Sequence, residues 1–200
     1  MRFVIDNLTF ERHDQPLFSG IHCTLYAGEL LQVRGTNGSG KSTLLRILAG
    51  FIAPQEGEVR WQNAPVSQQN LHYMGHQNGI KQNLTVIENI KLYCALAMLK
   101  KNNDELDHVM QKINLHHAMH TPAAQLSAGQ LRRLSLAKLV LNPTALWILD
   151  EPTTALDAEG NTFVTELLTQ HLENDGIAII ATHQDITVKC PTKTLWLGKI

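Results

Sequence analysis

A glycine-rich stretch, GTNGSGKS, occupies residues 35–42 and combines the residue types that bind a polyphosphate. It fits the pattern GxxxxGK[ST] and stands between a run that favours a strand and a run that favours a helix, which is the context this motif needs. Its glycines let backbone amides curl around phosphate oxygens, and the amino end of the following helix adds its dipole. The stretch therefore predicts a binding site for a nucleoside triphosphate.

The side chains of this loop have separate expected roles. Lys41 is expected to reach the β- and γ-phosphates, the Ser42 hydroxyl to ligate Mg²⁺, and Thr43 to support a contact to the α-phosphate. The predicted nucleotide contacts of the loop are Gly35, Thr36, Asn37, Gly38, Ser39, Gly40, Lys41, Ser42 and Thr43. The alternative is a glycine-rich turn that matches by chance, and the flanking strand and helix patterns count against it.

Two adjacent carboxylates end the apolar run LWILDEP, at Asp150 and Glu151. Asp150 suits the orientation of Mg²⁺ through its water shell. Glu151 is expected to point the other way from the strand end, where it could polarise an attacking water as general base. Carboxylates at strand ends also cap helices, so the pair alone leaves both interpretations open. Beside a phosphate loop, the pattern favours hydrolysis.

His183 ends another apolar run, IAIIATH. A single histidine at a strand end is more often solvated or a capping residue. At the carboxyl edge of a parallel sheet beside a phosphate loop, however, it occupies the place of a γ-phosphate sensor. There it could hydrogen-bond the γ-phosphate and hold Glu151 and the water in line.

The elements that must position these residues follow from the hydrophobic pattern. The expected strands cover residues 2–10, 20–29, 29–35, 57–62, 71–77, 145–152 and 176–183. A helix is expected over 41–50, with Gly50 as its C-terminal cap, and another around 157–173. Residues from about 85 to 141 are helical in character, without a convincing strand. Strands that alternate with helices predict a parallel sheet, here interrupted by a helical segment.

The composition is that of a globular protein. The 200 residues are 44% apolar and 18% charged, and the net charge of −1 gives no electrostatic argument for binding nucleic acid or anionic lipid. Three dispersed cysteines without CxxC spacing favour a reducing compartment. No apolar run approaches the roughly 20 residues that span a bilayer, and the first residues lack a signal peptide's pattern. We expect a cytosolic chain whose membrane partner, if any, is another protein.

A second candidate anion site, LSAGQ at Leu126–Gln130, opens an amphipathic helix. Together with the preceding motifs it resembles the nucleotide-binding domain of ATP-binding-cassette (ABC) proteins over essentially the whole chain. The resemblance implies one domain, 1–200, of the α/β P-loop NTPase class, with a RecA-like mixed sheet core, an antiparallel β subdomain and a helical subdomain at about 85–141. Its implied motifs are Walker A at Gly35–Ser42, Walker B at Leu146–Glu151, the Q-loop Gln77, the signature Leu126–Gln130, the D-loop Asp157 and the H-loop His183.

The same resemblance implies an ATPase with ATP and Mg²⁺ as cofactors. Lys41, Glu151, His183 and Gln77 are the implied catalytic residues, and Ser42, Gln77 and Asp150 the implied magnesium ligands. The implied partner is a second copy of the chain in a head-to-tail ATP sandwich. The signature residues Ser127, Ala128, Gly129 and Gln130 then act on the ATP held by the other copy.

Two positions depart from the usual ABC pattern. Ala128 replaces the commoner glycine of LSGGQ, which a small residue can tolerate. The position of the aromatic residue that stacks on adenine, about 23 residues before Walker A, holds Arg12, with Phe10 the nearest aromatic. An arginine can stack through its guanidinium plane. Strand alternation places Phe10 and Arg12 on one face, so either could serve.

Within the ABC proteins, YMGHQNGIKQNLTVIENI, LSAGQLRRLSLAKL and ALWILDEPTTALD resemble the ATP-binding subunit of the heme exporter of cytochrome c maturation. This implies a CcmB-like permease subunit and other membrane proteins of cytochrome c maturation as partners, a position on the cytoplasmic face of the inner membrane, and no nucleic acid. The alternatives are the ATPase of another small ABC exporter or a non-transport ABC ATPase. The latter class usually carries tandem cassettes, coiled coils or basic arms.

Overall fold

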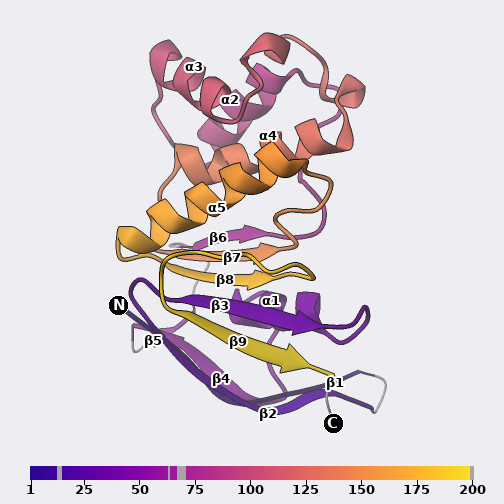
Figure 1. The fold of residues 1–200 in the computed structure, drawn as a ribbon, viewed down its shortest axis with the longest axis vertical. Helices are drawn as coiled ribbons and strands as arrows, with labels where there is room; N and C mark the ends of the chain where they lie inside the picture. Colours follow the sequence, from indigo (N-terminus) through magenta and orange to yellow (C-terminus); the bar gives the residue numbers. More distant parts are fainter. Residues whose placement is uncertain (13–14, 63, 67–70, 199–200) are drawn as a thin grey trace. The chain divides into compact units, whose positions relative to one another are not determined.

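Five short strands pair in parallel to form one sheet, in the order β6–β7–β8–β3–β9 (Figure 1). The computed structural model describes residues 1–12, 15–62, 64–66 and 71–198. The five strands are β3 (Leu30–Gly35), β6 (Leu71–Met74), β7 (Leu146–Asp150), β8 (Ile177–Ala181) and β9 (Thr192–Leu197). Every residue of β7 and β8 is buried, as in strands that are covered on both faces.

The alternation of strands and helices predicted a parallel sheet, whereas the resemblance implied a mixed core sheet. The pairs β6–β7, β7–β8, β8–β3 and β3–β9 are all parallel. Each strand returns to the same edge of the sheet before the next one begins, so neighbouring strands run the same way. Among the described residues, the antiparallel strand pairs belong to a separate sheet, and one isolated antiparallel bridge joins Thr85 and Pro122.

That second sheet has the order β2–β1–β4–β5 and antiparallel pairing throughout. Its strands are β1 (Arg2–Arg12), β2 (Gln15–Tyr26), β4 (Glu56–Trp61) and β5 (Ala64–Pro65). Inward-facing residues alternate along β1 from Phe3 to Ile5, and Asn7, with a left-handed φ of 48°, shifts the alternation so that Leu8 is buried next. The strand therefore contains an irregularity in its register between Ile5 and Leu8, after which the other set of alternate residues faces inward.

Helix α1 (Lys41–Leu48) follows β3 directly and carries four of its apolar side chains inward. One cluster of buried side chains joins α1, the parallel sheet and the antiparallel sheet. β7 and β8 contribute alternate residues to this cluster, including Leu146, Ile148 and Ile179. The helix and the strand ends around the glycine-rich loop therefore rest on one core.

The chain divides into two compact units. The first unit comprises residues 1–76, 144–152 and 165–200 and contains both sheets; the second comprises 77–143 and 153–164. The helices of the second unit are α2 (Val86–Leu96), α3 (Asn103–Lys112), α4 (Ala128–Leu141) and the first turns of α5 (Ala158–Glu173), with short 3-10 turns at His116–Ala118 and Ala123–Gln125. The expected helical segment, 85–141, lies within this unit.

Side-chain caps begin three of these helices. Thr85, Asn102 and Ser127 each accept a hydrogen bond from the backbone three residues later, and a glutamate or glutamine at that position bonds back. Such capping boxes satisfy amides that the helix leaves without partners. The three helix starts are thus encoded locally, by short patterns in the sequence.

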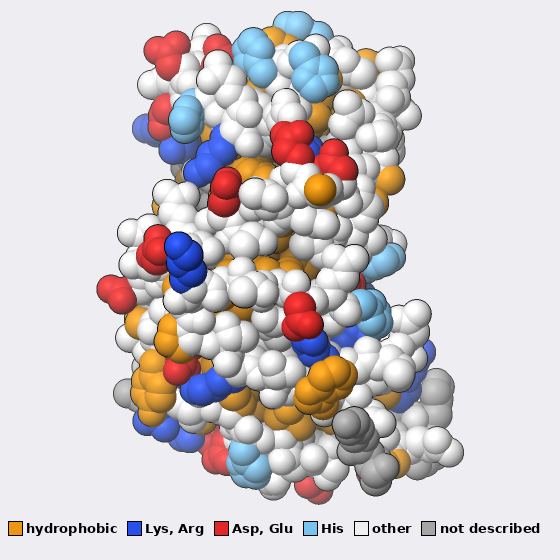
Figure 2. Space-filling view, viewed as in Figure 1, with side chains coloured by type: hydrophobic (Ala, Val, Ile, Leu, Met, Phe, Trp, Pro, Cys, Tyr) orange, Lys and Arg blue, Asp and Glu red, His pale blue; other side chains and the backbone are white. Residues whose placement is uncertain are grey.

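Charged side chains of both signs are interspersed over the face that Figure 2 shows. None of the described helices is both long enough and apolar enough to cross a bilayer.

A nucleotide-binding and hydrolysis centre

The glycine-rich loop turns sharply between β3 and α1, and two glycines make the turn possible. Gly35 has a φ of 153°, and a Cβ there would lie 2.5 Å from the Leu197 carbonyl oxygen. Gly40 caps α1 with a φ of 97°, and a Cβ there would lie 2.6 Å from the Leu17 side chain. A side chain at either position would have to displace neighbouring atoms, so glycine is required.

The loop leaves its amides available to an anion. Thr36, Asn37 and Gly38 are exposed, and Gly40 provides no side chain to cap the first turn of α1. The amino end of α1 thus presents backbone N–H groups beside an exposed loop, which is the arrangement that binds phosphate. Ser42 is exposed and Thr43 half-buried in the same turn.

Lys41 is buried at the mouth of this loop. Its side-chain ammonium donates hydrogen bonds to the carbonyl oxygens of Gly35, at 2.9 Å, and Thr36, at 3.1 Å. The same Nζ lies 3.4 Å from Nε2 of His183. The ammonium is therefore held at the carboxyl end of β3.

The two carboxylates lie at the carboxyl end of β7, as predicted. Asp150 is the last residue of the strand and is only 3% exposed. Glu151 has a left-handed φ of 50°, and its N–H donates to the Ala181 carbonyl oxygen at 2.9 Å. This conformation is strained for a residue with a side chain, and strain of this kind concentrates at functional sites.

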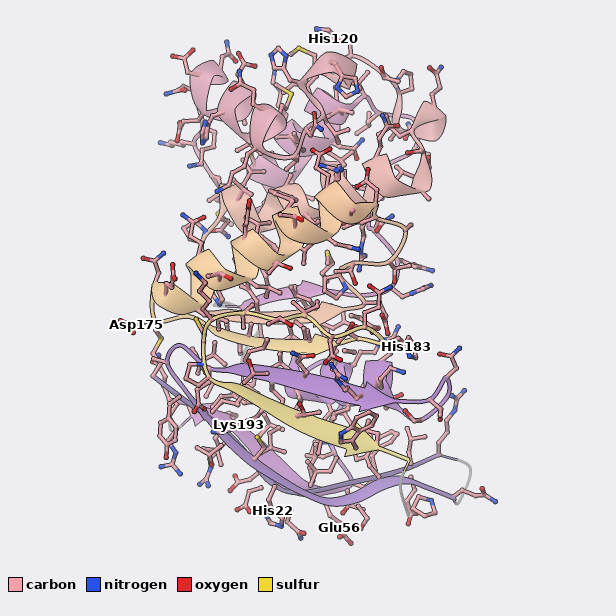
Figure 3. All side chains as sticks on the ribbon, viewed as in Figure 1. His22, Glu56, His120, Asp175, His183 and Lys193 are labelled. Atoms are coloured by element: carbon pink, nitrogen blue, oxygen red, sulfur yellow. The ribbon has the colours of Figure 1, made fainter. Side chains whose placement is uncertain are left out.

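His183 joins the other two groups. It comes two residues after the end of β8, and Figure 3 places it beyond the arrowhead of β8. Between them, the N–H of Thr182 bonds to the Val33 carbonyl oxygen of β3. Nε2 of His183 lies 3.3 Å from Oε1 of Glu151. One ring nitrogen thus faces a carboxylate and an ammonium at once: as an acceptor it suits Lys41, and as a donor it suits Glu151.

The predicted signature begins α4 in the second unit. Ser127 is the exposed N-cap: its Oγ accepts from the Gln130 N–H at 3.2 Å, and its own N–H donates to Oε1 of Gln130 at 2.9 Å. Ala128 is exposed, and Gly129 packs closely, since a Cβ there would lie 2.8 Å from the Ala155 carbonyl oxygen. Within LSAGQ, position 128 therefore has room for the alanine side chain, whereas position 129 has no room for a Cβ and needs glycine.

A buried arginine ties this helix to the D-loop, and the sequence analysis did not identify it. Arg133 contacts the carboxylates of Asp157, at 3.1 Å, and Glu159, at 3.6 Å. The pKa of Asp157 is lowered, first because its carboxylate accepts the Gly160 N–H and then because of Arg133. A signal was present: the sequence places an arginine inside the apolar pattern of a helix, where a charge needs a partner.

The remaining predicted residues are Gln77, Arg12 and Phe10. Gln77 is exposed at the start of the second unit. Arg12 is exposed at the end of β1, whereas Phe10 is half-buried, packs against the core and stacks on Phe18 at 6.2 Å. The choice between Phe10 and Arg12 as the adenine-stacking residue stays a prediction.

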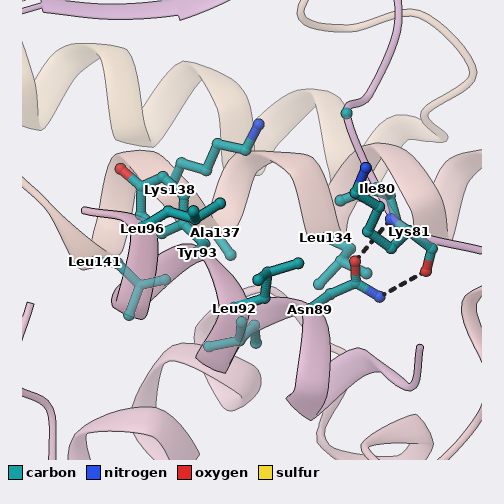
Figure 4. Close-up of a pocket in the computed structure, with 12 residues that line it drawn as sticks. Ile80, Lys81, Asn89, Leu92, Tyr93, Leu96, Leu134, Ala137, Lys138 and Leu141 are labelled. Atoms are coloured by element: carbon teal, nitrogen blue, oxygen red, sulfur yellow. Dashed lines mark hydrogen bonds between the residues drawn. The ribbon is translucent and has the colours of Figure 1, made fainter. Parts of the chain in front are cut away.

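The second unit also contains an apolar pocket of about 130 Å³ between α2, α4 and the segment after Gln77 (Figure 4). Asn89 fixes that segment by bonds to the backbone N–H and carbonyl oxygen of Lys81, at 2.8 and 3.0 Å. Lys138 is the basic residue of α4 on the pocket wall, and burial lowers its pKa. Leu96, which is 74% exposed, lines the wall formed by α2.

Sequence similarity to characterised proteins extends over nearly the whole length of the chain. The ABC transporter family matches residues 18–154. The cytochrome c biogenesis ATP-binding export protein CcmA of Haemophilus influenzae is 41% identical over 188 residues, which cover 91% of this chain and 89% of that protein. The protein of the same name from Methylococcus capsulatus is 42% identical over 193 residues, covering 94% and 93%.

Solved structures share the fold. An ABC transporter ATP-binding protein from Pyrococcus furiosus matches with a TM-score of 0.86 at 23% identity, over 98% of each chain. A dimeric ATP-binding cassette in a post-hydrolysis state, bound to ADP and Pi, matches with a TM-score of 0.78 at 22% identity, over 91% of this chain and 88% of that one. The predicted family and fold class are confirmed. The chain belongs to the ABC transporter family of ATP-binding proteins, among the cytochrome c biogenesis ATP-binding export proteins.

Proposed function

We propose that the chain is the ATP-hydrolysing subunit of the export complex of cytochrome c biogenesis, with Lys41, Glu151 and His183 at its reaction centre. The observation that carries the proposal is their convergence: Nε2 of His183 lies 3.3 Å from the Glu151 carboxylate and 3.4 Å from the Lys41 ammonium. The three side chains belong to separate segments of the chain. An ammonium, a carboxylate and an imidazole around an exposed glycine-rich loop are groups that can support phosphoryl transfer to water.

The reaction is ATP + H₂O → ADP + Pi. The water oxygen bonds to the γ-phosphorus as the bond from that phosphorus to the bridging oxygen breaks, and ADP leaves. Glu151 takes a proton from the water, and Lys41 stabilises the charge that develops on the β- and γ-phosphate oxygens. His183 orients the γ-phosphate and, through Nε2, the Glu151 carboxylate.

The donor set fits Mg²⁺. Ser42 offers an exposed hydroxyl oxygen and Asp150 a carboxylate, and hard oxygen donors are the ligands that Mg²⁺ prefers. Gln77, the third ligand that the resemblance implied, stays a prediction. No group of three or more acidic, histidine or cysteine side chains able to hold a metal occurs in the described part of the chain, so the ion would share its ligands with the nucleotide phosphates. When bound, Mg²⁺ would neutralise phosphate charge.

Substitution of Glu151 by glutamine tests the assignment of the base. Glu151→Gln removes the proton acceptor but keeps the shape, so ATP binding should persist while turnover falls about a hundredfold or more. Glu58→Gln, on the exposed surface of β4, is the matched control and should hydrolyse ATP at the parent rate. Phosphate release and equilibrium ATP binding measure the two effects. Parent-like turnover of Glu151→Gln would show that another group is the base.

The active assembly that we propose contains two copies of the chain. The hydroxyl oxygen of Ser127 accepts the capping hydrogen bond, and the hydroxyl hydrogen can donate to the γ-phosphate of an ATP held by another copy. The structurally similar cassette that carries ADP and Pi is dimeric. Each ATP would then lie between the Walker A loop of one copy and the signature of the other.

The membrane partner that we propose is a CcmB-like permease of the heme-export system, with the chain on the cytoplasmic face of the inner membrane. The name of its relatives, export protein, supports a membrane partner. The pocket beside Lys138 suits an apolar side chain and a neighbouring carboxylate of the partner, because an ammonium whose pKa is lowered by burial gains from a negative charge.

Lys138→Met should weaken the partner's binding while leaving ATP binding unchanged. Lys91→Met, on the exposed face of α2, should leave both unchanged. Co-purification of each variant with a co-expressed CcmB-like membrane subunit measures the difference. Equal recovery of the permease with both variants would contradict this docking site.

A further inference from the structure

The turn that carries His183 is fastened to β3 at its far end as well as at its start. This turn, residues 182–186, begins with the bond from Thr182 to Val33. Within it, the Thr182 hydroxyl bonds the backbone of Gln184 in both directions, at 3.1 Å from the N–H and 2.9 Å from the carbonyl oxygen. The backbone around His183 is thereby folded into a compact local turn.

Two polar residues on one face of β3 hold the end of the turn. Gln32, 4% exposed, donates to the Ile186 carbonyl oxygen at 2.7 Å. Arg34 donates to the carboxylate of Asp185 and, at 2.9 Å, to Oε1 of Gln32. These residues are two apart on a strand, so they share a face, and each contacts the turn through a different residue.

The Arg34 contact differs from an ordinary surface ion pair. The arginine side chain is only 15% exposed, and its guanidinium carbon lies 5.7 Å from the centre of the Trp196 ring. An exposed pair contributes little because water screens it and both side chains must be ordered. Here the ring and Gln32 already fix the guanidinium, so less conformational freedom is lost when Asp185 binds.

Arg34 also directly precedes Gly35, the first residue of the glycine-rich loop. We propose that Arg34 and Asp185 form a positioning pair that holds the His183 imidazole in register with Lys41 and Glu151 for hydrolysis. The inference rests on the proposed role of His183. The proposal gives Arg34 of β3 an effect on catalysis without contact with the nucleotide, because Arg34 fixes the turn that carries His183.

The test is a double-mutant cycle on the full-length chain. Arg34→Gln and Asp185→Asn each remove the charge pairing, and each should lower kcat about fivefold to tenfold, a loss of roughly one hydrogen-bonded ion pair. The KM for ATP should stay within about twofold, because the phosphate loop and Lys41 are untouched. Arg34→Lys should recover part of the lost kcat. Arg60→Gln, which removes an arginine paired with a carboxylate on the surface of β4, is the control.

Combining Arg34→Gln with His183→Ala shows whether Arg34 positions His183 or only stabilises the fold. If Arg34 acts through His183, Arg34→Gln should lower turnover no further in the His183→Ala background, and the double variant should match His183→Ala. Losses that multiply, or a single variant with parent kcat, would overturn the proposal. Parent-like turnover of His183→Ala would instead refute the role of His183 itself. Should Arg34→Gln fail to fold, Asp185→Asn completes the cycle, because its carboxylate is 80% exposed.

Discussion

Glu151 combines two properties: it is the proposed base, and it sits in a backbone conformation that favours glycine, with a φ of 50°. The conformation follows from its position, since its N–H continues the ladder to Ala181 while the chain already turns away from β7. The turn carries the carboxylate to His183 rather than along the strand. Strain at this residue is thus coupled to the geometry of the site.

Glu151→Gly should therefore be more stable than Glu151→Ala. Both variants lose the carboxylate and its contacts, but only glycine relaxes the left-handed backbone, which is worth about 1 kcal/mol. Thermal or denaturant unfolding of the two variants measures the difference, and neither should turn over ATP. Asp175, exposed with a φ of 62°, provides the matched pair Asp175→Gly and Asp175→Ala. Equal stability of the two Glu151 variants would show that the backbone there is unstrained.

At the scale of elements, the carboxyl-terminal half of α5 packs on β7 through an aromatic stack within the first unit. The rings of Trp147 and His171 lie 3.9 Å apart and 7° from parallel. His171 Nε2 also lies 3.1 Å from the Ile177 carbonyl oxygen. Burial, and secondarily His72, lowers the pKa of His171 to about 4. The contact between helix and strand therefore favours the neutral imidazole.

This burial predicts a loss of stability in acid. The unfolded His171 takes up a proton near pH 6.5 and the folded one only near pH 4. The contribution of the neutral His171 to the free energy of unfolding is thus complete above about pH 6.5. It falls as the pH drops from about 6.5 toward 4, and about 2 kcal/mol of it is lost at pH 5. His171→Phe keeps the stack but cannot titrate, so its stability should fall less between pH 7 and 5. Denaturant unfolding at both pH values measures this, with the exposed His117→Gln expected to follow the parent. An unchanged slope in His171→Phe would contradict the assignment.

At the scale of the whole molecule, the proposed sandwich assigns different motifs of one site to different copies. Walker A and Glu151 of one site come from the same chain, whereas the signature comes from the partner. In a dimer of two different variants, a Walker A defect in one copy and a signature defect in the other fall in the same site, so the second site is intact. A Walker A defect in one copy and a base defect in the other fall in different sites, so neither site is intact. This distinction can be tested by mixing inactive variants.

Lys41→Ala and Ser127→Arg should each abolish ATPase activity alone and restore part of it when mixed. In a mixed pair, one site combines the intact Walker A loop of Ser127→Arg with the intact signature of Lys41→Ala. A mixture of Lys41→Ala with Glu151→Gln is the control and should stay inactive, because both of its sites keep one defect. Steady-state phosphate release measures the recovery. Activity in the control, or none in the first mixture, would contradict the shared site.

The sequence by itself determined which residues are candidates for the chemistry. The phosphate loop, the paired carboxylates and LSAGQ are local patterns, in which residue type and spacing over fewer than ten positions indicate a function. Helix starts such as that at Ser127 were also visible, because a capping box spans only four residues. The strand and helix periods predicted most of the strands and the helical segment in the same way. The expected strands did not include β5 or β9, and β2 begins at Gln15 rather than at residue 20.

Only the tertiary structure decided which of these residues meet. His183 reaches Lys41 across 142 positions, and Arg34 reaches Asp185 across 151, because β7, β8 and β3 are neighbours in the sheet. The lateral order of the strands, β6–β7–β8–β3–β9, was likewise known only from the folded chain. Periodicity gives the face on which a side chain lies but not the strand beside it, since that depends on how the whole core packs. For this reason the positioning pair and the left-handed Glu151 could be found only in the folded chain.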